Sequence, residues 1–125
     1  MNRQIKFRGK KLKDNSWVYG LLTNDMKGHY RINFDPKSFS CVVKENTISQ
    51  FSGLTDKNGK DIYEGDIVLQ QGYHGKKAPM VVKFECGAFI VGYHDGSSTK
   101  RKPMLLNSRC EVIGNIYDNK DLLEE

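Results

Sequence analysis

The chain has 125 residues, of which 38% are hydrophobic and 28% are charged, and its formal net charge is +5 at pH 7. This composition is typical of a globular protein and argues against an intrinsically disordered chain. The length is that of one ordinary domain, so we expect a single domain over residues 1–125 with one core. We expect no export and no membrane insertion, because neither a signal-peptide segment nor a membrane-spanning apolar run is present.

The cysteines predict a reducing environment. Cys41, Cys86 and Cys110 are odd in number and far apart, and they form no C-x-x-C pair of the kind that binds zinc or carries redox chemistry. A chain of this length buries enough surface to fold without disulfides. We therefore expect a cytoplasmic protein.

Apolar and polar residues alternate with a period of two in the first half of the chain, which predicts strands. The first is expected at Ile5–Arg8, ended by Gly9. The second, Trp17–Leu22, is apolar on both faces, so we expect both faces to be buried. Three more strands are expected at residues 30–34, 40–43 and 47–51.

The second half begins with a turn. Asn58-Gly59 predicts a type I′ turn, because both central residues of that turn need positive φ and these two residues tolerate it. The chain should therefore reverse there. A strand over Ile62–Leu69, interrupted at Gly65-Asp66, is expected to follow.

Clean alternation over Met80–Cys86 predicts a half-buried strand, and Cys86-Gly87 is expected to turn the chain into a hairpin with residues 88–93. Glu111–Tyr117 is expected to be the last strand, with one helical turn after it at Asp121–Glu125. Many short strands with little helix predict an all-β fold. The nearest simple form is an SH3-like barrel or roll with additional N-terminal strands, because closure removes exposed strand edges.

One short pattern occurs twice. Gly72-Tyr73-His74-Gly75 is followed by two basic residues and Pro79, and Gly92-Tyr93-His94-Asp95-Gly96 is followed by three basic residues and Pro103. Each proline stands where a strand can begin without losing a needed hydrogen bond. Either two similar basic loops project side by side, or the likeness is a coincidence in a glycine-rich β protein.

The acidic residues do not predict a catalytic or calcium site. In the stretch that starts at Asp56, the positions that an EF-hand loop requires hold Lys60, Asp61 and Ile67. Glu64 and Asp66 have the spacing of paired carboxylates, but carboxylates flanking a glycine at a strand entry usually solvate the turn.

The histidines do not predict a metal site or a catalytic triad. His29, His74 and His94 lack metal-ligand spacing, and His94-Asp95 has no partner nucleophile motif. We therefore expect no metal, no cofactor and no enzymatic activity.

The basic residues are better organised than the acidic ones. Aromatic residues beside cations suit nucleic acid, because bases stack on rings while Lys and Arg neutralise phosphates. The candidate binding residues are those of the two basic loops: Tyr73, Lys76, Lys77, Tyr93, Lys100, Arg101 and Lys102. The alternative is that strand-edge lysines deter aggregation and loop lysines stay hydrated.

The two ends of the chain carry opposite charge. The first residues are uniformly basic, with Arg3, Lys6, Arg8, Lys10, Lys11 and Lys13 preceding the first carboxylate. The last residues are mostly acidic, with Glu111, Asp118, Asp121, Glu124 and Glu125 outnumbering Lys120. These ends are expected to pair either within the fold or between subunits.

Several blocks of the sequence resemble one family. They are Ile5-Lys6-Phe7-Arg8-Gly9, Trp17-Val18-Tyr19-Gly20, the long block from Gln50 to Val68, and Val112-Ile113-Gly114-Asn115-Ile116-Tyr117. Together, and in this order, they resemble the YopX family of bacteriophage and prophage proteins. The resemblance implies a β-rich domain with an SH3-type barrel, acting in the bacterial cytoplasm, and it implies no catalytic residues.

The leading hypothesis is a non-enzymatic accessory protein that contacts DNA or RNA through the basic loops. The alternative is a protein-interaction module without nucleic-acid contact, either a homo-oligomer or a binder of a host or phage protein, that uses an exposed strand edge or apolar patch.

Overall fold

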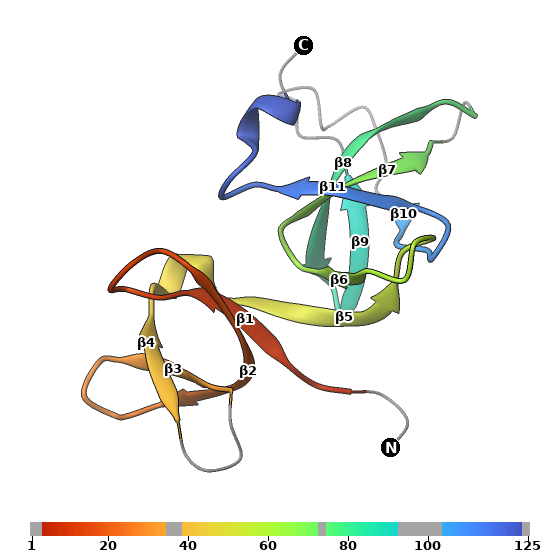
Figure 1. The fold of residues 1–125 in the computed structure, drawn as a ribbon. Coiled ribbons are helices and arrows are strands. Elements are labelled where there is room, and N and C mark those ends of the chain that lie inside the picture. Colours follow the sequence, from red (N-terminus) through yellow and green to blue (C-terminus); the bar gives the residue numbers. More distant parts are fainter. Residues whose placement is uncertain (1–3, 35–38, 73–74, 93–103, 124–125) are drawn as a thin grey trace. The chain divides into compact units, whose positions relative to one another are not determined.

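A computed structural model describes residues 4–34, 39–72, 75–92 and 104–123 (Figure 1). In these residues the protein is mainly β, as predicted, with antiparallel strands and two short 3-10 helices. The chain divides into two compact units, residues 1–53 and 54–125. None of the helices in the described ranges is long and apolar enough to cross a membrane.

The first unit is a small sheet that folds back on itself. Its strands lie in the order β4-β3-β2-β1-β5, with bounds β1 (Phe7–Lys10), β2 (Trp17–Asn24), β3 (Tyr30–Asn33), β4 (Ser40–Val43) and β5 (Ser49–Thr55). The 3-10 helix η1 (Glu45–Thr47) joins β4 to β5. The end of β1 and the residues after it pair with the edge of β4, since the Lys44 N–H donates to the Lys10 carbonyl at 2.9 Å and the Leu12 N–H to the Val42 carbonyl at 3.0 Å. This closure gives the edge strand β4 hydrogen-bond partners.

The first unit has a buried apolar cluster. Val18, Ile32 and Val43 form the cluster, and half-buried side chains such as Phe7 and Leu22 pack against it. Gly20, which pairs with Phe7, marks the place where β2 passes very close to β3. A Cβ added at Gly20 would lie 2.0 Å from the Asn33 carbonyl oxygen. The close approach of these two backbones therefore requires glycine.

The second unit is a five-stranded antiparallel sheet in the order β10-β9-β8-β7-β11, preceded by β6. The bounds are β6 (Asp61–Tyr63), β7 (Asp66–Gln71), β8 (Lys77–Glu85), β9 (Ala88–Gly92), β10 (Met104–Leu105) and β11 (Glu111–Asn115), followed by the 3-10 helix η3 (Lys120–Leu123). Its buried cluster is Ile62, Val68, Met80, Val82, Val91, Leu106 and Cys110. The strand β8 forms as predicted, with Met80 and Val82 buried, but the clean alternation does not hold, because Val81 between them is also buried and Phe84 is 47% exposed.

Asp56 links parts of the second unit that are distant in sequence. Its Oδ1 accepts the N–H groups of Asn58 and Lys60, both at 2.9 Å, and its Oδ2 accepts the Val112 N–H of β11 at 2.9 Å. Burial disfavours the charged carboxylate, but these backbone donors outweigh it and lower the pKa of the Asp56 carboxyl below its ordinary value of 3.8. One nearly buried side chain therefore holds both a turn and a strand 56 residues away.

The turns confirm one prediction and correct another. Residues 56–60 reverse the chain as expected, but only Gly59 takes positive φ, so the turn at Asn58-Gly59 is not type I′. The Asp56 carboxylate accepts the Asn58 N–H, which favours an Asx-type turn with negative φ at Asn58. The type I′ turn occurs instead at Cys86-Gly87, with φ of 53° and 78°, between the paired residues Glu85 and Ala88.

The strands also differ from the predictions in places. Gly9 does not end β1, because it lies inside the strand with its missing Cβ next to Val43 of the core. The strand predicted to be buried on both faces, β2, has Tyr19 49% exposed and Leu21 62% exposed. Pro79 lies inside β8 rather than at its start, before the point where β8 begins to pair with β9 at Val81.

The expectation of one core is wrong for the described residues, which form one buried cluster in each unit. Alternation shows that a strand has an apolar face, but it does not show which other strands cover that face. The domain boundary at residues 1–125 and the SH3-like form of the barrel stay predictions.

We predict that Asp56→Asn destabilises the second unit. The variant amide still accepts from the turn, but its NH₂ group faces the Val112 N–H, so two donors oppose each other in a nearly buried place. A cost of about 2 kcal/mol in the free energy of unfolding is expected. Because the pKa of Asp56 is lowered in the folded state, its contribution is present above pH 3.8 and is lost as pH falls through the folded-state value.

Urea unfolding followed by circular dichroism between pH 2 and pH 7 measures this effect. The wild type should lose more stability than Asp56→Asn as the solution is acidified. Glu85→Gln, at an exposed carboxylate, is the control and should behave as the wild type does. Equal acid sensitivity of Asp56→Asn and the wild type would contradict the assignment.

We also predict that Gly20→Ala destabilises the first unit by about 3 kcal/mol, because the new methyl group meets the Asn33 carbonyl and the neighbouring backbone cannot yield cheaply. Gly92→Ala is the matched control, since a Cβ there meets nothing within 4 Å. Thermal unfolding of both variants tests this expectation. A Gly20→Ala melting temperature equal to that of Gly92→Ala would show that β2 and β3 separate easily.

Candidate functional site

The structure describes two of the seven candidate binding residues. Lys76 and Lys77 are exposed where β7 turns into β8. The other five candidates, Tyr73, Tyr93, Lys100, Arg101 and Lys102, lie outside the described residues. Whether the two basic loops project side by side therefore stays a prediction.

Hydrogen bonds link the described residues next to the two lysines of the β7–β8 hairpin. The Gly72 N–H donates to the Lys76 carbonyl at 2.9 Å, and the Gly75 N–H donates to the Gly72 carbonyl at 3.0 Å. The Gln71 side-chain amide donates to the Gly75 carbonyl, also at 2.9 Å. These bonds continue the β7–β8 ladder from the Gln71–Lys77 pair to Gly72 and Lys76.

A groove of about 380 Å³ lies beside this hairpin, and we call it the hairpin groove. It is lined by two cations, three side-chain amides and one glycine: Lys77, Arg109, Gln70, Gln71, Asn107 and Gly72. No carboxylate is among these lining residues. Neither Lys77 nor Arg109 has a side-chain hydrogen bond or ion pair with any residue in the described ranges.

Gln70 gives the groove a rigid wall. Gln70 is only 2% exposed, and its Nε2 donates to the Leu105 carbonyl at 3.2 Å. Its Oε1 accepts the Asn107 N–H in a long contact of 3.5 Å. An uncharged amide buried with hydrogen bonds at both ends is stable and stays fixed.

The Asn107 side chain fixes the position of the second cation. Its Oδ1 accepts the Arg109 N–H at 2.9 Å, which forms an Asx turn just before β11. Lys77 from β8 and Arg109 from the β10–β11 connection therefore line one groove although 32 positions separate them. Cations with amide donors and no carboxylate are suited to binding phosphate oxygens.

Sequence reasoning missed Gln70, Asn107 and Arg109. Two signals were available: Gln70 stands two positions after Val68 and so shares the inward face of the strand, and Asn107-Ser108-Arg109 has the composition of a turn. Neither signal reveals that these residues meet the β7–β8 hairpin.

Three other charged residues that the sequence singled out have structural partners. Lys6 lies 4.6 Å from the centre of the Phe51 ring, and Arg8 lies 4.7 Å from that of Trp17. Asp66 accepts the Tyr63 N–H at 2.8 Å, so its role is structural, but it is buried and does not solvate the turn as predicted. In the described ranges no group of three or more His, Cys, Asp and Glu side chains is placed to hold a metal ion.

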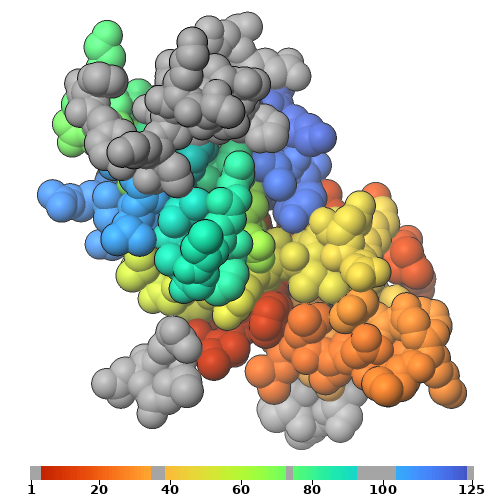
Figure 2. Space-filling model, turned by 180° about the vertical axis from the view of Figure 1, so that it is seen from behind, coloured from red at the N-terminus to blue at the C-terminus, as the bar shows by residue number. Residues whose placement is uncertain are grey.

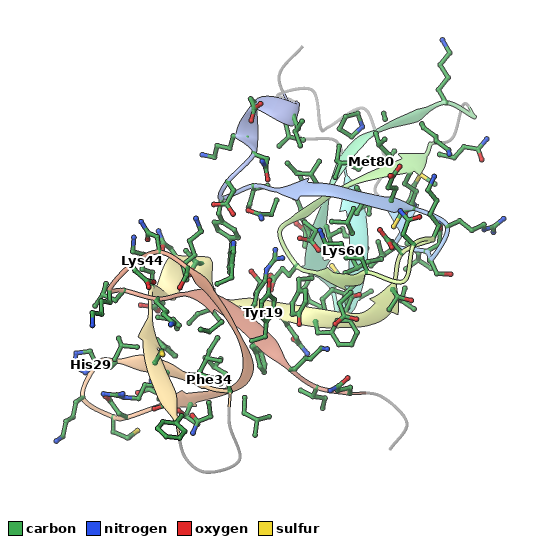
Figure 3. All side chains as sticks on the ribbon, in the orientation of Figure 1. Tyr19, His29, Phe34, Lys44, Lys60 and Met80 are labelled. Carbon is green, nitrogen blue, oxygen red and sulfur yellow. The ribbon has the colours of Figure 1, made fainter. Side chains whose placement is uncertain are left out.

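His29 is placed at the tip of the β2–β3 hairpin (Figure 3). Its Nδ1 lies 3.1 Å from Asp25 Oδ2, and Asp25 also accepts the N–H groups of Lys27 and His29. Figure 2 shows this hairpin, coloured orange, on the surface of the first unit. His74 and His94 lie outside the described residues.

Comparison with known proteins supports one family. The sequence matches the YopX protein family over residues 6–124. Among solved structures, the crystal structure of protein EF1440 from Enterococcus faecalis is similar, with a TM-score of 0.61 and 25% sequence identity. That match covers 98% of this chain and 99% of the other. No curated protein matches. The chain belongs to the YopX protein family.

Proposed function

We propose that this protein is a non-enzymatic accessory protein that binds nucleic acid at the hairpin groove and the β7–β8 hairpin beside it. The observation that carries the proposal is the meeting of Lys77 and Arg109 with three amides in a groove lined by no carboxylate. Lys76, exposed at the same hairpin, adds a third cation. Phosphate contacts of this kind give sequence-independent, salt-sensitive binding.

The rest of the chain's chemistry agrees with a polyanionic partner. The net charge of +5 raises the local concentration of DNA or RNA around the protein. The basic loop with Lys100, Arg101 and Lys102, and the aromatic residues Tyr73 and Tyr93, are proposed to extend the contact by phosphate neutralisation and base stacking.

We infer a biological setting from the family. YopX resemblance implies a bacteriophage or prophage gene, and the similar structure comes from a bacterium, so we propose action in the cytoplasm of a bacterial host. The hairpin groove contains no nucleophile paired with a base and no pair of carboxylates, which supports a binding role over a catalytic one.

The test is fluorescence anisotropy with labelled single-stranded DNA, duplex DNA and RNA of 20 nucleotides, titrated at several salt concentrations. The double variant Lys77→Glu/Arg109→Glu should weaken binding to all three about tenfold or more. It should also make the slope of log affinity against log salt less steep by about 2 on duplex DNA, since each phosphate contact contributes roughly 0.9.

Lys27→Glu/Lys120→Glu is the control, because it changes the net charge by the same amount at two exposed lysines outside the groove. It should keep most of the affinity and the wild-type slope. If the wild type binds none of the three probes at low salt, the proposal is rejected. If both double variants lose affinity equally, the hairpin groove is not the binding site.

A further inference from the structure

The first unit has its own groove, of about 560 Å³, where the turn after β1 passes over β4. We call it the leucine groove. It is lined by Leu12, Cys41, Val42, Lys11, Lys13 and Asp14. It shares no residue with the hairpin groove and plays no part in the proposed function.

The backbone holds the leucine groove in shape. The Leu12 N–H donates to the Val42 carbonyl at 3.0 Å, while the Lys11 N–H donates to the Ser16 carbonyl at 2.9 Å. The Asn15 N–H closes the turn on the Lys11 carbonyl at 3.0 Å. Leu12 is nevertheless 60% exposed, so an apolar side chain is presented to solvent from a fixed position.

The rim of the leucine groove attracts anions. Lys11 and Lys13 both line it. Its one carboxylate, Asp14, already accepts the Ser16 N–H at 3.0 Å and the Ser16 hydroxyl at 2.7 Å. The groove therefore combines apolar walls with a net positive rim, and its complement is an acidic segment that carries aliphatic side chains.

The chain itself contains such a segment. Residues 121–125 read Asp-Leu-Leu-Glu-Glu, which is two leucines framed by three carboxylates. Asp121 is exposed, and Leu122 and Leu123 in η3 are half-buried, so each leucine keeps apolar surface. The opposite charges of the two ends of the sequence match this pairing.

We propose that the leucine groove of one copy binds the acidic segment 121–125 of a second copy. If two copies exchange segments, the contact occurs twice around a two-fold axis. Each contact is small, so the association is weak and concentration-dependent, and because its charges lie at the surface it is weakened by salt.

Sedimentation velocity over about 5 to 500 µM protein tests the proposal. The wild type should sediment faster as its concentration rises at low salt, and this rise should shrink in 0.5 M NaCl. Two variants should each remain monomeric: Lys11→Glu/Lys13→Glu, whose groove is acidic, and Asp121→Lys/Glu124→Lys/Glu125→Lys, whose segment is basic. Circular dichroism should show that both are folded.

The decisive measurement mixes these two variants. In the mixture the acidic groove of the first variant meets the basic segment of the second, and the basic groove of the second meets the acidic segment of the first, so association should return. In each variant alone, the groove and the segment carry the same charge. Lys77→Glu/Arg109→Glu has the same charge change as the groove variant and should associate as the wild type does. A wild type that is monomeric throughout the range, or a mixture no more associated than its components, would overturn the proposal whatever the nucleic-acid titrations show.

Discussion

In a small β unit every strand edge must find partners for its backbone N–H and C=O groups, and this requirement shapes both halves of the protein. In the first unit the residues after β1 supply the partners by pairing with β4. In the second unit, side chains supply some of these partners: the Asp56 carboxylate accepts the Val112 N–H of β11, and the Gln70 amide donates to the Leu105 carbonyl of β10. Both grooves lie at places where an edge is closed in this way.

The sequence predicted the parts of the fold that depend on neighbours along the chain. Alternation located the strand β8, although it did not predict that Val81 is buried as well as Met80 and Val82, and Cys86-Gly87 was placed correctly as a turn. Prediction from the sequence failed where a contact between residues far apart in the chain determines the local structure. Asn58 would suit a type I′ turn by itself, but the Asp56 carboxylate captures its N–H, and Asp56 is in turn held by Val112. The same limit applies to the number of cores, which depends on which strands cover each other.

The candidate site likewise contains residues that the sequence could identify and residues that it could not. Lys76 and Lys77 could be singled out because they follow one another in a glycine-rich loop, whereas Arg109 reaches the groove only because β7 pairs with β11 and with β8. Gln70 is predictable as an inward-facing residue but not as a wall of the groove, since its partners lie 35 and 37 positions away. The proposed contacts to nucleic acid and to a second copy use different residues and so are chemically independent.

The three thiols have very different surroundings. Cys86 is exposed in the β8–β9 turn, Cys41 is half-buried, and Cys110 is buried. Burial, with the nearby Asp56 charge, raises the pKa of Cys110 to about 11, so at neutral pH it holds almost no thiolate, the form that reacts. A maleimide dye should consequently attach first to Cys86 and mark one tip of the second unit. The rate at which Cys110 is alkylated then measures how often the second unit opens.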